Sequence, residues 1–288
     1  MTKLSGVGVA IITPFKSDFS IDYDALDRVL EYVIKGRVNY IVTLGTTGET
    51  ATLTEEEKIA ILTHTVQKVN GRIPIVAGVG GNHTQEVIYK LQTWPLEGVE
   101  AILSVSPYYN KPTQEGIYQH YAAIARSTER SIILYNVPGR TMSNITPETT
   151  FRLAGEFKNI IGTKEASGNM IQCMHLCKSR PEGFLLLSGD DHLALPLVAL
   201  GFDGVISVAA NCFAADFTCL VHKALEGHYE EANLFQHKLL DGIDLLFEEN
   251  NPAGAKGFLA KMGLIENVLR LPLVPMSPAG MEKIRNFQ

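Results

Sequence analysis

The sequence predicts an α/β protein, a (β/α)8 TIM barrel with a C-terminal helical appendage. Eight short apolar runs of β character recur along the chain, and an amphipathic, helix-like stretch follows each run. These units are spaced about 20 to 33 residues apart and fill roughly the first 225 residues, close to the usual size of such a barrel. After about Gly227 the pattern changes to helices only. We therefore expect a barrel domain at residues 1–226 and a C-terminal helical region at residues 227–288.

The expected strands are mostly continuous in apolar residues, which is typical of parallel strands covered on both faces. In chain order they are Val7–Ile12, Tyr40–Leu44, Ile73–Val79, Ala101–Ser106, Ser131–Val137, Ile160–Lys164, Phe184–Ser188 and Gly204–Val208. The helices expected between them include Tyr23–Lys35, Glu55–Val69, Thr84–Trp94, Glu115–Arg126, Pro147–Gly155, Asn169–Lys178 and Leu193–Gly201. Two helix starts carry explicit signals: a capping box at Thr54–Glu57, and Thr146-Pro147, which puts proline at the first helical position.

The region after the barrel is expected to form helices at Tyr229–Glu248, Gly254–Met262 and Pro278–Phe287. No low-complexity linker precedes it, so we expect it to pack on the barrel, where it could cover the barrel or form an oligomer contact. A doubly wound open sheet is the competing architecture. The Gly78–Asn82 loop does not match the dinucleotide-binding fingerprint of that fold, and no P-loop is present.

Composition narrows the class of protein. With 25 Lys+Arg against 31 Asp+Glu the net charge is −6, and the lack of a basic stripe argues against a nucleic-acid partner. Hydrophobic residues make up 45% of the chain, which is ample for a large core and excludes intrinsic disorder. No apolar run reaches the roughly 18 residues of a membrane span, and Val7–Ile12 reads as a buried strand rather than a signal sequence.

The four cysteines, Cys173, Cys177, Cys212 and Cys219, lie in apolar helical settings. We expect reduced core thiols in a cytoplasmic protein. On a helix, His175 faces away from Cys173 and Cys177, and a zinc site there would lack its remaining ligands. The sequence predicts no metal site.

Polar groups gather where the expected strands end. Active sites of barrels lie at the carboxyl ends of their strands, so this convergence indicates an enzyme. The segments concerned are Gly45–Glu49, Pro107–Asn110, Tyr135–Arg140, Ile160–Glu165 and Ser188–Asp191.

Lys164 is the most informative of these residues, because it follows Ile160–Thr163 in a strand that we expect to be buried. Burial favours the neutral amine of a lysine, which can attack a carbonyl carbon and form a Schiff base. The alternative is that the ammonium group reaches solvent or pairs with Glu165.

The other candidates also have two interpretations each. Tyr135 is a core aromatic or a general acid/base beside Lys164. Thr46 and Thr47 form a tight turn or bind a carboxylate, and Arg140 is a solvated loop charge or a bidentate carboxylate ligand. Tyr108 and Tyr109 suit a packing pair at an interface, Asp190 and Asp191 suit helix capping, and the histidines suit structural or surface positions.

Together these motifs resemble the dihydrodipicolinate synthase family, within the pyruvate-dependent class I lyases and aldolases. The resemblance extends nearly from end to end, from Ile12–Phe15 to Leu271-Pro272. The matching segments are Gly45–Glu49, Pro107–Asn110, Tyr135–Arg140, Gly162–Gly168, Ser188–Asp191 and Gly204–Val208. A Gly45–Glu49 motif alone would be weak, but six matching segments in this order, five of them at strand ends, are highly specific.

The resemblance implies a role for each matching residue. Lys164 is similar to the lysine that forms a Schiff base with pyruvate, and Tyr135, Thr46 and Tyr109 to a proton relay in which Tyr109 comes from the neighbouring subunit. The substrate-binding positions are Thr47, Arg140, Gly189 and Ile206, of which Arg140 receives the carboxylate of L-aspartate-4-semialdehyde. The implied enzyme needs no metal or dissociable cofactor, and the family is usually a homotetramer built as a dimer of dimers.

Two other functions remain open on the residues. A sibling aldolase would use the same lysine on N-acetylneuraminate or a 2-keto-3-deoxy sugar acid; Arg140 and the Thr46-Thr47 pair favour the synthase. A non-catalytic barrel that serves as a binding protein would be expected to lose Lys164, a relay hydroxyl or the Gly45–Glu49 loop, and all three are present.

In lysine-inhibited relatives an effector binds at the subunit interface. The candidate effector or interface residues here are Tyr108, Asn82, Glu86, Thr50, Ala51, Glu55 and Lys58. Glu55 and Lys58 stand where those inhibited enzymes carry histidines. Because a cation at Lys58 would repel a cationic effector, we expect weak or absent inhibition by lysine. A lysine titration of the activity checks this, and strong inhibition at micromolar concentrations would overturn it.

Overall fold

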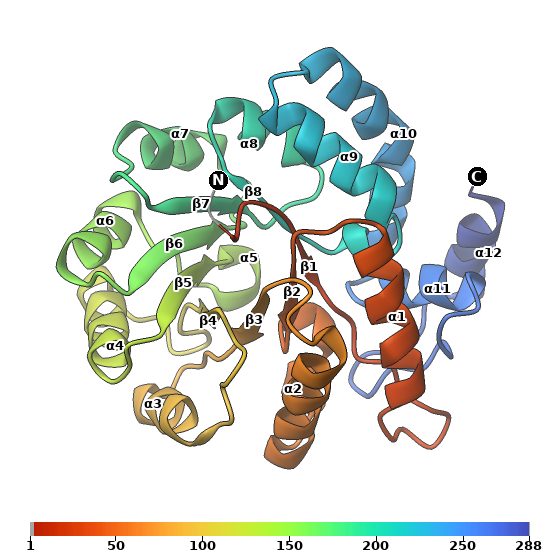
Figure 1. Ribbon diagram of the computed structural model, residues 1–288, viewed down its shortest axis with the longest axis horizontal. Helices are drawn as coiled ribbons and strands as arrows, with labels where there is room; N and C mark the ends of the chain where they lie inside the picture. The colour runs from red at the N-terminus through yellow and green to blue at the C-terminus, as the bar shows by residue number, and fades with distance from the viewer. Residues whose placement is uncertain (1–2, 288) are drawn as a thin grey trace.

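Eight parallel strands form a closed barrel in chain order, as the sequence predicts (Figure 1). The computed structural model describes residues 3–287. The strands are β1 (Gly6–Ala10), β2 (Tyr40–Thr43), β3 (Ile75–Gly78), β4 (Ala101–Val105), β5 (Ser131–Asn136), β6 (Ile160–Glu165), β7 (Leu185–Ser188) and β8 (Gly204–Ser207). Parallel pairing of β8 with β1, with Val205 opposite Val7, closes the ring.

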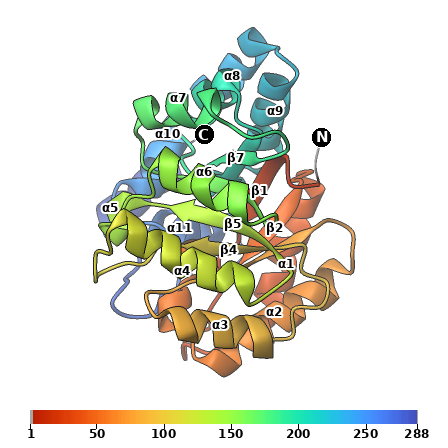
Figure 2. The ribbon, with the colours of Figure 1, turned by 90° about the vertical axis from the view of Figure 1, so that its left-hand side faces the viewer.

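Helices surround the barrel on its outside (Figures 1 and 2). They are α1 (Tyr23–Lys35), α2 (Glu55–Val69), α3 (Thr84–Thr93), α4 (Gln114–Arg126), α6 (Pro147–Glu156), α7 (Met170–Lys178), α8 (Ala194–Leu200) and α9 (Ala214–Leu225), while the short α5 (Pro138–Thr141) follows β5 at the carboxyl end of the barrel. The capping box at Thr54 and Glu57 starts α2 as expected. The helix expected after the eighth strand, for which no bounds were given, is α9, where Phe217, Leu220, Val221 and Ala224 recur at helical spacing and are buried.

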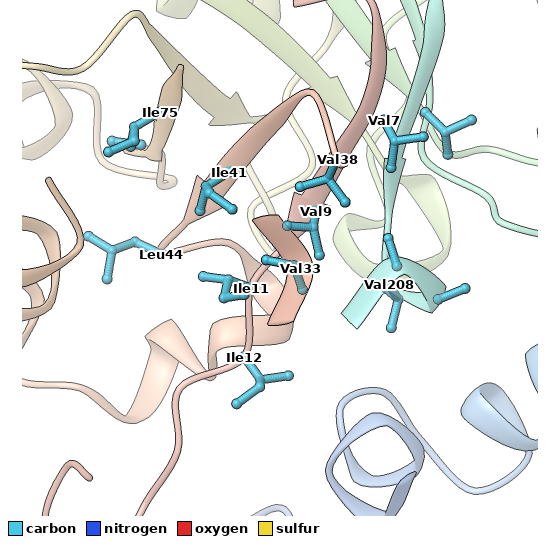
Figure 3. Packing of buried hydrophobic residues seen from close by; sticks show 14 of the residues in the cluster. Val7, Val9, Ile11, Ile12, Val33, Val38, Ile41, Leu44, Ile75 and Val208 are labelled. Carbon is cyan, nitrogen blue, oxygen red and sulfur yellow. The ribbon is translucent and has the colours of Figure 1, made fainter. Parts of the chain in front are cut away.

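Each strand is buried on both faces, and this explains the continuous apolar runs. Val9 and Ile41 point outward into a cluster that includes Val33 of α1 (Figure 3). Their neighbours Ala10 and Val42 point inward, into a cluster shared with Tyr135 and other strands. Side chains alternate between faces along a strand, so a residue's position decides which cluster it joins.

The C-terminal region continues with α10 (Tyr229–Phe247), α11 (Ala253–Lys261) and α12 (Pro278–Asn286). Helix α10 packs on α8 and α9, and α11 packs on α10, so this region lies against the barrel as expected. Figure 1 shows α11 and α12 on the same side of the molecule as α1. No helix within residues 3–287 is long and apolar enough to cross a membrane.

The structure corrects the expectation that all four cysteines are core thiols. Cys173 and Cys212 are buried and Cys177 is half-buried, but Cys219 is exposed on α9. Position on the helix explains the difference, because Leu220 and Val221 take the buried face beside it.

Candidate active site

A cavity of about 540 Å³ opens at the carboxyl ends of the strands. Its apolar floor includes Ala10, Val42 and Leu103 from the barrel interior. The polar residues that line it include Thr46, Thr47, Tyr135, Arg140, Lys164, Asp190, His192 and Asn251. Five of the strand-end residues singled out from the sequence therefore meet in one place, and Gly189 lines the same cavity.

Lys164 lies on β6 directly opposite Tyr135 of β5, and both side chains are buried. Its Nζ lies 4.2 Å from the centre of the Tyr135 ring. Within residues 3–287 no carboxylate lies within ion-pair distance of this amine. The amine is thus held over an aromatic ring at the edge of an apolar interior, where a small substrate can reach it.

Glu165 does not pair with Lys164, so that alternative is wrong. Adjacent strand residues point to opposite faces, and the Glu165 carboxylate accepts hydrogen bonds from Asn136 Nδ2 (3.0 Å), Gln172 Nε2 (2.9 Å) and the Ser167 backbone N–H (2.7 Å). Asn136 in turn donates to Asn144 Oδ1 (2.8 Å). This buried network holds the segment that carries α5.

Gly189 has a steric reason to be glycine. A methyl group on its Cα would lie 2.7 Å from Lys164 Cε and 2.6 Å from Ala166 Cβ. The lysine side chain therefore packs directly over the backbone at the end of β7. Ile206, the other expected backbone position, is buried in the interior cluster with Tyr135 but does not line the cavity.

The loop after β2 forms a short helical turn, η1 (Thr46–Gly48). Thr46 is exposed to the cavity, whereas Thr47 is buried and its Oγ1 accepts a hydrogen bond from Asn251 Nδ2 at 3.1 Å. The Gly48 carbonyl accepts one from Thr13 Oγ1 (2.8 Å). The loop is thus both a tight turn and a source of hydroxyl groups at the cavity.

Arg140 lies on α5, just after β5, and its side chain is exposed at the cavity. Among the described residues no carboxylate pairs with its guanidinium group. An unpaired guanidinium at the mouth of a cavity is suited to bidentate binding of a substrate carboxylate.

His192 is a cavity residue that the sequence interpretation placed among structural or surface histidines. Its Nε2 lies 2.8 Å from Asp244 of α10 and its Nδ1 lies 3.6 Å from Asp190. Hydrogen bonding to Asp190, and then to Asp244, raises the pKa of His192 to about 9, against the burial that lowers it. The imidazole is therefore charged at neutral pH. In the sequence, only the two adjacent carboxylates, Asp190 and Asp191, could have indicated that His192 differs from the other histidines.

Asp191 does not cap a helix, so the capping interpretation is wrong. Helix α8 begins after Leu193 without a side-chain cap. The Asp191 carboxylate is buried and accepts hydrogen bonds from the backbone N–H groups of Val208 (3.0 Å) and Ala209 (2.9 Å), and burial raises its pKa. It ties the end of β7 to the end of β8 beneath the cavity.

The profile of the Dihydrodipicolinate synthetase family matches residues 3–287. The chain belongs to the dihydrodipicolinate synthetase family. A 4-hydroxy-tetrahydrodipicolinate synthase from Parabacteroides distasonis is 55% identical over 283 residues, covering 98% of this chain and 95% of that protein. The solved dihydrodipicolinate synthase of Thermotoga maritima has a TM-score of 0.96 and 40% identity, over 99% of this chain and 98% of that one. Another, from Cyanidioschyzon merolae with lysine bound, has a TM-score of 0.95 and 35% identity, over 99% and 97% of the two chains.

For this member of the dihydrodipicolinate synthetase family, Tyr109 lies outside its own chain's cavity. It is 87% exposed and adopts a positive φ of 71°, with its backbone N–H donating to the Thr141 carbonyl (3.4 Å). Exposed Tyr108 and Met142 adjoin it. Tyr109 is therefore the one expected relay residue that does not line the cavity among the residues that the structure describes.

Most of the expected effector residues make contacts within the chain. Asn82 Nδ2 donates to the Tyr108 carbonyl (3.1 Å), and Thr50 Oγ1 donates to the Gly45 carbonyl (2.7 Å). Lys58 pairs with Glu55 (2.8 Å), while Lys90 pairs with both Glu55 (3.3 Å) and Glu86 (2.5 Å). Ala51 lies exposed in the turn η2 (Thr50–Thr52). The charged groups among these residues are therefore already paired within the chain.

The packing at Gly189 predicts that Gly189→Ala displaces Lys164. Trapping of pyruvate on the protein with borohydride should fall by about 100-fold, because even a small misplacement of a reacting group is costly. Gly155→Ala is the matched control, since a methyl group at Gly155 of α6 meets open space. Equal trapping by the two variants would contradict the assigned packing.

Proposed function

We propose that the chain is a 4-hydroxy-tetrahydrodipicolinate synthase, a lyase that condenses pyruvate with L-aspartate-4-semialdehyde in the diaminopimelate route of lysine biosynthesis. The observation that carries this proposal is the pairing of two groups in one cavity: the buried amine of Lys164 and the free guanidinium of Arg140. Membership of the family and the curated relatives support it.

The reaction starts when the amine of Lys164 attacks the keto carbon of pyruvate. Loss of water gives an imine, and loss of a proton from the pyruvate methyl group gives a nucleophilic enamine. The enamine carbon adds to the aldehyde carbon of the semialdehyde, forming the new C–C bond. The amino group of that substrate then attacks the imine carbon, closes the ring and expels Lys164 as a free amine.

Tyr135 is the proposed proton carrier, since its ring lies 4.2 Å from Lys164 Nζ and its side chain lines the cavity. Thr46 would complete the relay with Tyr109 of a neighbouring copy. Thr47, held by Asn251, would bind the pyruvate carboxylate, and the backbone at Gly189 would line that site, whereas Ile206 lies in the interior cluster with Tyr135.

The alternative is a sibling aldolase that cleaves N-acetylneuraminate or a 2-keto-3-deoxy sugar acid. It would share the Schiff base on Lys164 but has no need for a second carboxylate ligand. Arg140, exposed at the cavity and unpaired among residues 3–287, favours the synthase.

A homotetramer built as a dimer of dimers, located in the cytoplasm, completes the proposal. Exposure of Tyr108, Tyr109 and Met142 beside α5 supports contact with a second copy. We also propose that the chain divides into a barrel domain, residues 1–226, and a C-terminal region, residues 227–288. The proposed reaction needs no metal or cofactor.

We still predict weak inhibition by lysine, but for a different physical reason than repulsion by a free Lys58. Lys58 is neutralised by Glu55 rather than free to repel a cation. Glu86, which would attract the ammonium group of an effector, is instead engaged by Lys90 of its own helix. A cationic effector would have to displace this internal ion pair.

Replacing Arg140 tests the second substrate. Arg140→Ala should lower kcat/KM for the semialdehyde by about 10- to 150-fold, the equivalent of ~1.5–3 kcal/mol for a charge-assisted hydrogen bond. The assay couples the product to dihydrodipicolinate reductase and follows NADPH. Arg285→Ala, an exposed arginine on α12, is the control. Normal semialdehyde kinetics in Arg140→Ala would contradict the role of Arg140. No turnover of the semialdehyde by the wild-type protein, with pyruvate still trapped on Lys164, would favour the sugar-acid aldolase.

A mixing experiment tests whether Tyr109 acts across subunits. Tyr109→Phe and Lys164→Ala should each be nearly inactive alone. After unfolding and refolding together, mixed dimers regain one complete site, so roughly a quarter of wild-type activity should return. Activity of Tyr109→Phe alone at the wild-type level, or no recovery on mixing, would contradict the shared site.

A further inference from the structure

A buried ion pair lies directly behind the loop that carries Thr46 and Thr47. The carboxylate of Glu49, the last residue of that loop, pairs with Nζ of Lys256 on α11, and both side chains are completely buried. Glu49 also accepts a hydrogen bond from the backbone N–H of Arg270 (3.0 Å), and Lys256 donates to the Val268 carbonyl (2.9 Å). Each charged group therefore makes one further hydrogen bond, Glu49 as acceptor and Lys256 as donor.

An aromatic ring stabilises the same cluster. Lys256 Nζ lies 4.1 Å from the centre of the Phe15 ring, and the Arg270 guanidinium carbon lies 4.4 Å from it. Arg270 is held in turn by Glu57 at the start of α2 (2.6 and 2.7 Å). Burial lowers the pKa of Lys256 to about 8, with Glu49 opposing the shift, so the ammonium form still dominates at neutral pH.

This arrangement is a costly way to stabilise a fold. Two buried charges lose their hydration, and apolar residues of the same volume are often as stabilising or more so. Glu49 also adopts a positive φ of 53°, a left-handed conformation that non-glycine residues seldom take. Core packing alone does not explain why a charged residue occupies this strained position.

The position of the pair relative to the cavity suggests its purpose. Glu49 lies two residues after Thr47, and Lys256 lies five residues after Asn251, whose Nδ2 donates to Thr47 Oγ1 (3.1 Å). One C-terminal segment thus contacts the loop twice, at Thr47 and at Glu49. Lys256 itself does not line the cavity, so it acts through the loop and not on the substrate.

We propose that Glu49 and Lys256 are positioning residues for pyruvate: their ion pair fixes the Thr46–Thr47 turn at the distance from Lys164 that carboxylate binding requires. The inference deepens the proposed function and rests on it. It also makes the C-terminal region a structural part of the active site, because Asn251 and Lys256 both contact the loop that carries this turn.

The test compares Glu49→Gln, Lys256→Met and the double variant, with borohydride trapping on Lys164 measured against pyruvate concentration. We expect the half-saturating pyruvate concentration to rise about 10- to 100-fold in each single variant. The KM for the semialdehyde should stay within about twofold, because Arg140 is on a different element. The double variant should be no worse than the worse single one, since the two residues act as one unit.

Arg180→Met is the matched control, because it breaks an ion pair with Asp203 (2.8 Å) at the opposite end of the barrel. It should lower the Tm without changing pyruvate binding. Glu49→Gln keeps the side-chain volume, and the double variant leaves no unpaired buried charge, so each provides a folded protein if Lys256→Met does not.

Wild-type pyruvate saturation in the folded variants, with only the Tm reduced, would overturn the inference and leave the proposed function intact. Absence of trapping in the wild-type protein would instead overturn the proposed function.

Discussion

An amine held inside a closed barrel, against a glycine and without a carboxylate, is the constraint on which the site depends. Lys164 occupies an inward-facing position of β6, so its side chain has only the barrel interior and the cavity above it to enter. Gly189 leaves room for its methylene groups, and Tyr135 supplies an aromatic face in place of an ion partner. A carboxylate at any of these positions would form an ion pair with the amine and compete with a substrate for it.

The parts of the site that surround this amine are held by a second layer of buried polar contacts. Glu165 and Asn136 fix the segment of Arg140, and Asp191 fixes the ends of β7 and β8. Glu49 and Lys256 hold the loop of Thr47. Each of these contacts joins residues that are distant in the chain, and each places a cavity residue at the carboxyl end of a strand, where the barrel leaves room for chemistry.

Local pattern was enough to predict most of the fold and the inner residues of the site. Continuous apolar runs mark strands buried on both faces, and a lysine at the end of such a run stands out because nothing else in the run is charged. Asn251, Asp191 and Lys256 gave no such signal. Asp191 was interpreted as a helix cap, and neither Asn251 nor Lys256 was singled out, because their partners lie between 17 and 207 positions away in the sequence. Only the closed fold brings these groups together. Cys219 was predicted to be buried because its neighbours in the sequence are apolar, but its side chain lies on the exposed face of α9.

The central claim is that Lys164 is the nucleophile, and mass spectrometry of the borohydride-reduced protein tests it most directly. Lys256 is the informative competitor, because it is the other deeply buried lysine near the cavity among residues 3–287, and burial lowers its pKa to about 8. We predict a single pyruvate-derived adduct on the peptide that carries Lys164, absent from Lys164→Ala. An adduct on Lys256 or on any other lysine, or none at all, would contradict the account.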